Sequence, residues 1–597
     1  MRIDKHLKLG VAVVLGGMAL AGAQTGTIGV HDDIAQNPAF TLKKQHPAAW
    51  NPFVADMVML DDTRMVLLEF VFGPTDRENT SGVPKKNGNL WIVSNLEAAD
   101  PEQVKTELIA KELSEPTGLC VANGKIYVAQ KLELTEFTLG AAGAMATPRK
   151  VAPLTLDPLG LANFQEYNFG LLYKDGYFYT ATGGAVRIGG LSWVDDIGKL
   201  SDLTRSGLLK IKADDGSQEL LVGGLRAPNG LAVGPDGDFW VTDNQGSFLP
   251  ACKLIHIVPG KNYGYTNGPN KFRGMEETPP AVWFPYGEIG KSITHPTLMK
   301  TGTFAGQFLM GDISLGGMMR ASVENVGGTW QGSAHSFGGG FEAGIEASVE
   351  LKSGSYVLGG LGRGDNGNWG WRGKLTGFQL LTPKAGTVNF EIKALHAKAE
   401  GIEIEFTKPV GAGADVAANY TVFSGVMTPG PKYGEGNMLT KTLITVTAVK
   451  ISTDKLRVLL QLDGLAAHVK KVIAVRVGAP IKSETAEDAF RPAAWYTLNV
   501  MSTTPWSAGT AIHPRAGVQG LGAGDIAVAR SGAGLTVKLP FAGSHELTLR
   551  NLQGKALETL SGKGATEYAL GANHLVPGLY LIDVKVDGVA MRKSVVF

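Results

Sequence analysis

The sequence predicts an all-β protein that consists of a six-bladed β-propeller, an immunoglobulin-like β-sandwich and a small C-terminal β-sandwich. Three observations predict this fold class. A strand–turn–strand pattern recurs six times between residues 50 and 385. The chain of 597 residues contains 80 glycines and few long amphipathic runs, which is typical of turn-dense β structure. Beyond residue 386 the pattern changes to plain apolar–polar alternation, which indicates half-buried antiparallel strands.

Residues 1–23 are predicted to be a secretory signal peptide. Three basic residues precede an apolar run at 9–21, and Ala21-Gly22-Ala23 matches the small-residue cleavage pattern. An uncleaved anchor is the alternative. No later stretch reaches about twenty uninterrupted apolar residues, so we expect no transmembrane segment in the mature chain. We therefore expect a protein that is secreted or held at the outer-membrane surface, with residues 24–49 as an N-terminal extension.

Residues 50–385 are predicted to form the propeller. The clearest repeat runs from Arg226 to Gly246 and contains the turn Gly234-Pro235-Asp236-Gly237, in which proline fixes φ and glycine accepts a positive φ. Similar hairpins, roughly fifty to sixty-five residues apart, begin near Phe53, Glu115, Tyr167, Ile293 and Phe341. Radial repetition of four-stranded sheets leaves only short, protected edges, so six such units favour a propeller over a plain sandwich.

Two further β units follow the propeller. Residues 386–501 alternate apolar Ile402 and Ile404 with Glu403 and suit an immunoglobulin-like sandwich. A stretch rich in Ser, Thr, Pro and Gly at 502–515 is predicted to be a linker. Residues 516–597 alternate again and are predicted to form the C-terminal sandwich.

Charge and cysteine content exclude several classes of function. A net charge of +1 without a cluster of Lys and Arg argues against nucleic-acid binding. The two cysteines, Cys120 and Cys252, could pair in an oxidising compartment or remain as two buried thiols. No CxxCH motif is present, so we expect no covalently attached haem.

Candidate site residues follow from the blade pattern. The first strand of each blade lines the axis of a propeller, so polar residues that introduce these strands should gather at one mouth of the channel. These residues are Glu115, Asn168, Arg226, Asn229, His295, Glu342 and Glu346. A set of acids, amides, a guanidinium and an imidazole is typical of a polar small-molecule or metal site.

Each candidate has a chemical role and a structural alternative. His295 is the candidate catalytic base near pH 7, although a histidine before proline can also be structural. Asp243, Asn244 and Glu342 carry hard oxygen ligands that suit calcium, and the first two could instead be turn residues. Arg226 offers a fixed fork for an anionic cofactor, or a partner for an acid of the next blade.

Three more residues are candidate cofactor contacts or anion contacts. Asn168 and Asn229 are candidates because both introduce first strands, and Asn229 could instead cap the Pro-Asn-Gly turn. Arg363 lies in the glycine-rich loop 359–370, as Arg187 lies in 183–190, where a cofactor contact and a solvated loop charge are both consistent with the sequence.

The segment GLRAPNGLAVGPDGDFWVTDNQG, followed by IHIVPGKNYGY, resembles the glucose/sorbosone dehydrogenase family. The resemblance implies a six-bladed propeller that oxidises a sugar or sugar-derived aldehyde with pyrroloquinoline quinone and calcium. It also implies that Arg226 contacts the quinone carboxylates. Asn168 stands where the family has its catalytic histidine, so His295 or Glu166 would have to replace that base.

The same hairpin is similar to gluconolactonase-type propellers. That resemblance implies calcium held by a carboxylate, by an asparagine from a PNG-type turn and by a later aspartate. Asn229 matches the asparagine, and Glu115 or Glu342 would be the carboxylate. A calcium-dependent lactonase is therefore one alternative function. The other is a non-catalytic carbohydrate-binding propeller in which Trp193, Trp369 and Trp371 stack on sugar rings.

The C-terminal segments LTLRNLQGKALETLSG and LVPGLYLIDVKVDG resemble the C-terminal sorting domain of type IX secretion. The resemblance implies passage across the outer membrane and a secretion machinery as partner. The middle unit looks like the immunoglobulin-like domain that follows the propeller in related dehydrogenases of environmental bacteria. The other expected partner is a small-molecule carbohydrate or a polysaccharide.

Overall fold

A computed structural model describes most of the chain. The described residues are 36–71, 85–154, 167–184, 204–265, 270–314, 316–361, 376–432, 435–509, and 527–596 apart from 532–533, 540–543, 552–554, 565, 571–574, 576–578 and 587–588. Their regular elements are strands and short 3₁₀ turns, which confirms the all-β class. Within these ranges no helix is both long and apolar enough to cross a membrane.

Six antiparallel blades of four strands each form the propeller, and the fifth of them is part of a larger, eight-stranded sheet. Blade 1 contains β2 (Val54–Met59), β3 (Arg64–Phe70), β4 (Lys86–Ser94) and β5 (Lys105–Ser114), with the 3₁₀ turn η1 (Pro101–Gln103) before β5. Blade 2 contains β6 (Gly118–Ala122), β7 (Lys125–Ala129), β8 (Glu133–Thr138) and β9 (Thr147–Pro153). Blade 3 contains β10 (Asn168–Lys174), β11 (Tyr177–Thr182), β12 (Gly207–Lys212) and β13 (Gln218–Gly223).

The second half of the ring repeats this arrangement. Blade 4 contains β14 (Pro228–Val233), β15 (Phe239–Asp243), β16 (Cys252–His256) and β17 (Val282–Phe284). Blade 5 contains β18 (Thr297–Leu298), β19 (Phe308–Asp312), β20 (Gly317–Val326) and β21 (Thr329–Gly338). Blade 6 contains β22 (Ile345–Glu350), β23 (Tyr356–Leu361), β24 (Thr376–Pro383) and, as its outer strand, β1 (Phe40–Lys44).

The six first strands close into a ring. Each first strand contacts the first strand of the next blade, in the order β2, β6, β10, β14, β18 and β22, and β22 contacts β2. The six hairpins singled out in the sequence are the first two strands of these six blades, so the six-bladed propeller is confirmed. The segment expected as an N-terminal extension contributes β1, which pairs with β24 and completes blade 6.

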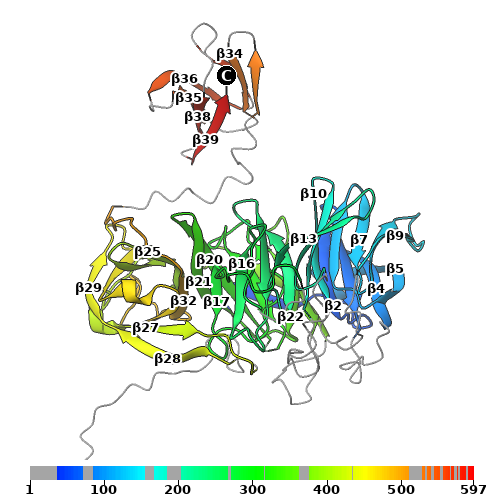
Figure 1. Ribbon diagram of the computed structural model, residues 1–597, viewed down its shortest axis with the longest axis horizontal. Coiled ribbons are helices and arrows are strands. Elements are labelled where there is room, and N and C mark those ends of the chain that lie inside the picture. Colours follow the sequence, from blue (N-terminus) through cyan, green and yellow to red (C-terminus); the bar gives the residue numbers. More distant parts are fainter. Residues whose placement is uncertain are drawn as a thin grey trace, which may run out of the picture.

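An eight-stranded sheet joins the propeller to the following sandwich (Figure 1). The outer strand β21 of blade 5 pairs with β32 (Ala493–Leu498), so that Ala334 lies opposite Trp495. The sheet continues through β31 (Lys471–Val477), β27 (Tyr420–Met427) and β28 (Asn437–Ile444). Trp240, Phe308 and Trp495 share one hydrophobic core at this junction.

The second sheet of the sandwich packs against this one. It consists of β25 (Ile392–Lys398), β26 (Gly401–Phe406), β30 (Arg457–Leu462) and β29 (Val446–Ile451), and the connections include the 3₁₀ turns η4 (Ala417–Asn419) and η5 (Leu465–His468). Ile402, Ile404 and Phe406 are buried with Ile473 and Tyr496 in the core between the sheets. The predicted alternation thus places the apolar face of β26 inward.

The C-terminal unit has two small sheets and a core of its own. One sheet contains β33 (Ala527–Ser531), β34 (Gly534–Leu539) and β37 (Thr566–Leu570). The other contains β36 (Ala556–Lys563), β35 (Ser544–Arg550), β38 (Leu579–Val586) and β39 (Val589–Val596). Leu547, Leu549, Val537 and Ile582 belong to its buried cluster, which agrees with the predicted small sandwich.

Candidate functional site

Four polar side chains converge at the axis of the propeller, and we call them the axial site: Asp56 in β2, Asn229 in β14, His295 just before β18, and Glu346 in β22. His295 Nδ1 lies 3.4 Å from Asp56 Oδ1. Asn229 Nδ2 donates to Glu346 Oε2 over 3.5 Å. His295 and Asp56 belong to blades 5 and 1, with blade 6 between them, and Asn229 and Glu346 belong to blades 4 and 6, with blade 5 between them. Each contact therefore spans a whole blade. Only side chains directed toward the axis can do this.

The Asp56 carboxylate is buried and held by backbone groups. Its Oδ2 accepts the N–H of Leu119 in β6 over 2.9 Å, and its Oδ1 accepts the N–H of Met57 over 2.8 Å. A carboxylate fixed in this way orients an imidazole that approaches it and favours a proton on the facing nitrogen. Asp56 therefore faces Nδ1 of His295, which leaves Nε2 as the ring nitrogen that can act on a substrate.

His295 is the most accessible member of the axial site. Its side chain is 24% exposed. Its backbone N–H donates to Glu346 O over 3.3 Å, which ties blade 5 to blade 6. Gly230 packs against its backbone so closely that a Cβ atom on Gly230 would lie 2.5 Å from the Cα of His295. The imidazole is thus fixed by its surroundings but open to a ligand, which is the arrangement that a general base needs.

Asn229 and Glu346 present hard oxygen atoms to the axis. Asn229 is 5% exposed, and its Oδ1 accepts no hydrogen bond from any described residue. A buried acceptor without a donor costs about 1–3 kcal/mol, so such an atom is expected where a ligand or cation supplies the partner. Amide and carboxylate oxygens are the ligands that calcium prefers.

Asn168 lies between blades 2 and 3, where its amide is fully engaged. Arg205 Nη1 donates to Asn168 Oδ1 over 2.7 Å, and Asn168 Nδ2 donates to the carbonyl oxygen of Gln130 over 2.9 Å. Arg205 also donates to the carbonyl oxygens of Tyr167 and Gly183. These bonds give Asn168 a structural role.

Glu115 is also engaged in a buried contact. Its Oε2 lies 2.6 Å from Lys131 Nζ, and both side chains are almost completely buried. Removing either partner would leave an uncompensated charge in the interior. Glu115 therefore contributes to packing at the start of blade 2.

Arg226 is buried against the backbone of its own blade. The side chain is 1% exposed, and Nη1 donates to the carbonyl oxygens of Gln245 over 2.7 Å and Asn244 over 3.3 Å. A Cβ atom on Gly246 would lie 2.0 Å from the guanidinium carbon, so a side chain at that position would have to displace the guanidinium. The fork that was expected to hold a quinone thus binds a loop of blade 4.

Asp243 and Asn244, the predicted calcium ligands, are also tied to this loop. The two carboxylate oxygens of Asp243 accept the N–H groups of Arg226 and Ala227 over 3.0 and 2.8 Å. Burial raises the pKa of Asp243, against the opposing charge of Lys253. Asn244 Oδ1 accepts from Cys252 Sγ over 3.2 Å. The described contacts do not favour a metal here, and the calcium role of the two residues stays a prediction.

The remaining predicted residues are placed as follows. Glu342 precedes β22 and is half-buried, and its backbone N–H donates to Gln379 Oε1 over 3.1 Å. The predicted contacts that lie outside the described residues are Arg187, Arg363, Glu166, Trp193, Trp369 and Trp371.

Sequence reasoning missed Asp56. A signal was available, because Asp56 is the single charged residue of the otherwise apolar strand β2, VADMVM. An isolated carboxylate in a buried strand indicates a specific partner, here the N–H of Leu119 and the imidazole of His295.

The two cysteines are buried and free. Cys120 lies in β6 of blade 2 and Cys252 in β16 of blade 4. Burial raises the pKa of the Cys120 thiol, and it raises the pKa of the Cys252 thiol to about 12. The two cysteines are therefore two buried, inert thiols and do not form the disulfide that was the alternative.

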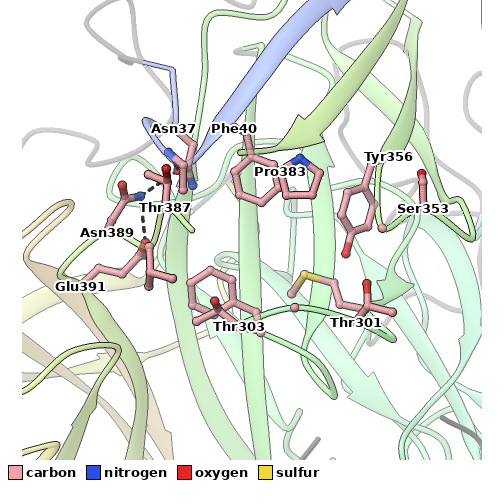
Figure 2. Close-up of a pocket in the computed structure, with 16 residues that line it drawn as sticks. Asn37, Phe40, Thr301, Thr303, Ser353, Tyr356, Pro383, Thr387, Asn389 and Glu391 are labelled. Atoms are coloured by element: carbon pink, nitrogen blue, oxygen red, sulfur yellow. Dashed lines mark hydrogen bonds between the residues drawn. The ribbon is translucent and has the colours of Figure 1, made fainter. Parts of the chain in front are cut away.

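Two cavities among the described residues lie away from the axis. One, of about 280 Å³, is lined by β1, β23 and the start of the sandwich, and Figure 2 shows Asn389 between Asn37 and Glu391 at one end of it. The other, of about 940 Å³, is an open groove beside Asp61 and Lys352. Neither cavity is lined by a residue of the axial site.

No family model matches the sequence, and no curated protein matches it. A solved oxidoreductase (glucose dehydrogenase) of Thermus thermophilus is similar to the chain with a TM-score of 0.40 and 14% identity, covering 57% of this chain and 99% of that one. The PQQ-bound aldose sugar dehydrogenase of Streptomyces coelicolor is similar with a TM-score of 0.39 and 12% identity, covering 58% of this chain and 99% of that one.

A gluconolactonase of Xanthomonas campestris is also among the similar solved structures. Its TM-score is 0.29 and its identity 11%, covering 60% of this chain and 98% of that one. Similarity at these levels carries no conclusion about activity.

Proposed function

We propose that the protein is an enzyme that acts on a sugar-derived substrate at the axial site, with His295 as general base. The observation that carries this proposal is the approach of His295 Nδ1 to the buried Asp56 carboxylate, 3.4 Å away, while the histidine side chain stays 24% exposed. The carboxylate orients the imidazole and stabilises the imidazolium that forms when Nε2 takes a proton.

Hydrolysis of a sugar lactone is the reaction that the described residues support best. Asn229 Oδ1 and the Glu346 carboxylate offer oxygen ligands to a hard cation such as calcium. Calcium bound there would polarise the lactone carbonyl. His295 Nε2 takes a proton from water as the water oxygen adds to the carbonyl carbon. The ring C–O bond then breaks, and the imidazolium returns the proton to the leaving alkoxide, which gives a hydroxy acid.

Oxidation of a sugar or sugar-derived aldehyde with pyrroloquinoline quinone is the second proposal. The same oriented base favours it, because His295 Nε2 can remove a hydroxyl proton as well as a proton of water. The described residues do not fit the quinone, since the Arg226 guanidinium is bonded to backbone carbonyl oxygens and Asn168 is fully engaged. Arg363, the remaining predicted contact, lies outside the described residues.

Secretion is proposed from the sequence motifs. The charged and apolar N-terminal segment and the C-terminal motifs support export through a signal peptide, followed by type IX secretion. A carbohydrate ligand outside the cell would agree with this route.

The test uses the purified mature chain from residue 24 onward. We would measure proton release from aldonolactones in calcium and in chelator, and dye-linked oxidation of aldoses with added pyrroloquinoline quinone. Calcium-dependent lactone hydrolysis that His295→Gln abolishes is the expected result. Asp61→Asn is the matched control, because Asp61 is an exposed aspartate of the same blade as Asp56.

The other outcomes discriminate between the hypotheses. Dye-linked oxidation that needs quinone, without lactone hydrolysis, would replace the first proposal by the second. Sugar binding without turnover in either assay would overturn the enzyme proposal and leave the non-catalytic carbohydrate-binding propeller.

A further inference from the structure

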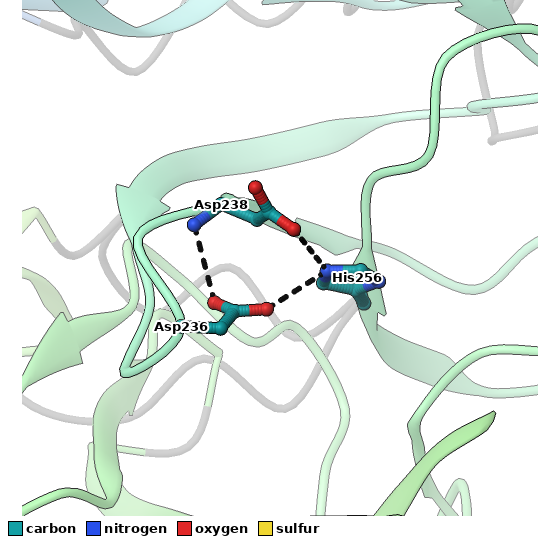
Figure 3. Close-up of side chains that lie close together, drawn as sticks. All are labelled: Asp236, Asp238 and His256. Carbon is teal, nitrogen blue, oxygen red and sulfur yellow. Dashed lines mark hydrogen bonds and ion pairs between the residues drawn. The ribbon is translucent and has the colours of Figure 1, made fainter. Parts of the chain in front are cut away.

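A second cluster of chemically active side chains lies at the other end of the same hairpin. Asn229 stands near the start of β14, whereas Asp236 and Asp238 belong to the turn that follows the end of this strand. Figure 3 shows both carboxylates directed at one edge of the His256 ring. His256 Nε2 lies 2.9 Å from Asp236 Oδ2 and 3.1 Å from Asp238 Oδ2. We call these three residues the turn cluster.

The Asp236 carboxylate is oriented before any ligand binds. Its Oδ1 accepts the indole N–H of Trp240 over 3.0 Å and the backbone N–H of Asp238 over 3.2 Å, which leaves Oδ2 directed at the imidazole. The close approach of Trp240 requires glycine at 234, where a Cβ atom would lie 2.0 Å from the indole nitrogen. Hydrogen bonds to the second oxygen of a carboxylate are the usual way in which proteins orient a metal ligand.

The His256 ring is also fixed in place. It packs against the indoles of both Trp240 and Trp330, with ring centroids 5.0 and 5.6 Å away, and the two indoles also contact each other. Trp240 lies directly opposite His256 in the β15–β16 pair. The side chain is 13% exposed, so water reaches only its edge. An imidazole held by packing loses little conformational freedom when it binds an ion.

We propose that the turn cluster binds a divalent transition-metal ion, with Zn²⁺ as the representative ion. The three ligand atoms all lie within 4.8 Å of one another, which suits three ligands at about 2.0–2.1 Å from a common ion. One imidazole and two carboxylates form a nitrogen and oxygen set that zinc and its neighbours in the first transition row accept. This site is separate from the axial site and does not depend on the proposed reaction.

The charge and exposure of the cluster agree with a cation site. Two carboxylates face one imidazole. The Lys174 ammonium group bonds to the backbone of the turn and not to these carboxylates, because Nζ donates to the carbonyl oxygen of Gly237 over 3.1 Å. Asp238 is 60% exposed, so solvent can supply the remaining ligands of the ion. The ion would bridge the β14–β15 turn to β16, and by binding only the folded state it would stabilise blade 4.

Calorimetric titration of the metal-free mature chain with Zn²⁺, in excess calcium, tests the proposal. We expect one equivalent of Zn²⁺ to bind, since imidazole is a poor ligand for calcium, and calcium would fill sites made of oxygen ligands instead. Asp238→Asn should weaken the binding at least tenfold, and His256→Gln should abolish it. Asp215→Asn is the matched control, because Asp215 is an exposed aspartate in a turn of blade 3 and pairs with Lys212.

A spectroscopic readout locates the ion. Bound Co²⁺ should quench the fluorescence of the two indoles beside His256, and Trp330→Phe should reduce that quenching while leaving the Zn²⁺ stoichiometry at one. The proposal is overturned if no saturable Zn²⁺ binding occurs, or if Asp238→Asn binds Zn²⁺ as tightly as the unaltered chain. In either case the turn cluster would be an ion pair between His256 and its two carboxylates.

Discussion

His295 Nδ1 and Asp56 Oδ1 lie 3.4 Å apart, although the two residues belong to the fifth and the first blade. No local structure brings them together. The contact forms because six first strands close into a ring, which directs both side chains to the same axis. The proposed base and the group that orients it are therefore a product of ring closure.

Replacement of Asp56 should separate orientation from folding. Asp56→Asn keeps the size of the side chain but removes the charge that stabilises the imidazolium, so we expect kcat to fall by roughly ten- to a hundredfold with little change in KM. Asp56→Ala should in addition lower the free energy of unfolding by about 1–3 kcal/mol, because the N–H of Leu119 loses its acceptor. Steady-state kinetics and urea unfolding would measure the two effects. An unchanged kcat in Asp56→Asn would contradict the assignment.

Arg226 should behave as a structural residue. Arg226→Met removes a buried donor to the carbonyl oxygens of Asn244 and Gln245, and we expect the free energy of unfolding to fall on the order of 2–4 kcal/mol. Arg64→Met is the control, because this exposed ion pair with Asp61 is worth less than about 1 kcal/mol. Urea unfolding measures both. If Arg226→Met kept its stability but lost quinone binding, the result would support the predicted contact between Arg226 and the quinone.

The stability of the junction between blade 5 and the sandwich should fall in alkali. His396 Nδ1 lies 3.1 Å from Glu324 Oε2, and Nε2 lies 3.3 Å from Glu405 Oε2. Desolvation lowers the pKa of His396, but hydrogen bonds and charges of the two carboxylates outweigh it and raise the pKa to about 9. Because the folded state binds this proton more tightly than the unfolded state, the contribution is complete below pH 6.5 and is lost as the pH rises toward 9.

We therefore expect the free energy of unfolding to fall on the order of 2–3 kcal/mol between about pH 6 and about pH 9.5. His396→Gln should abolish most of this slope, since the amide does not titrate. Urea titrations of both chains at several pH values measure it. A slope that is equal in the two chains would show that other groups cause it.

The eight-stranded sheet makes a prediction for shortened chains. A chain that ends at residue 385 lacks β32 and therefore exposes the β21 edge together with the core around Phe308, so we expect aggregation. A chain that ends at residue 509 keeps the sandwich and should remain monodisperse, because the C-terminal unit has its own core. Size-exclusion chromatography of the two chains tests this. A monodisperse propeller from the shorter chain would refute the shared core.

The propeller could be predicted from the sequence because its signals are local. Tight turns with apolar strands beside them, such as Gly234 to Gly237, recur along the propeller, and the number of these hairpins predicts the number of blades. Strand β1 could not be found in this way, since Phe-Thr-Leu-Lys-Lys is short and its partner lies far along the chain. The fusion of β21 with β32 was missed for the same reason.

The candidate site could be predicted only in part. The blade pattern places His295, Asn229 and Glu346 near the ends of first strands, and the structure brings these three together at the axis. Position at a strand end does not determine where a side chain points, however. Arg226 and Asn168 occupy the same kind of position, and both are directed into the protein interior.

The pairing of β1 with β24 has a consequence for synthesis of the protein. Thr41 and its partner Thr382 are 341 residues apart, so β1 is synthesised first and has no partner strand until nearly the whole propeller has left the ribosome. The β21 edge likewise has no partner until β32 has been synthesised. During translation the nascent chain therefore carries two open sheet edges, and its early blades cannot settle into their final ring. Chaperones that shield such edges would therefore favour the yield of folded protein.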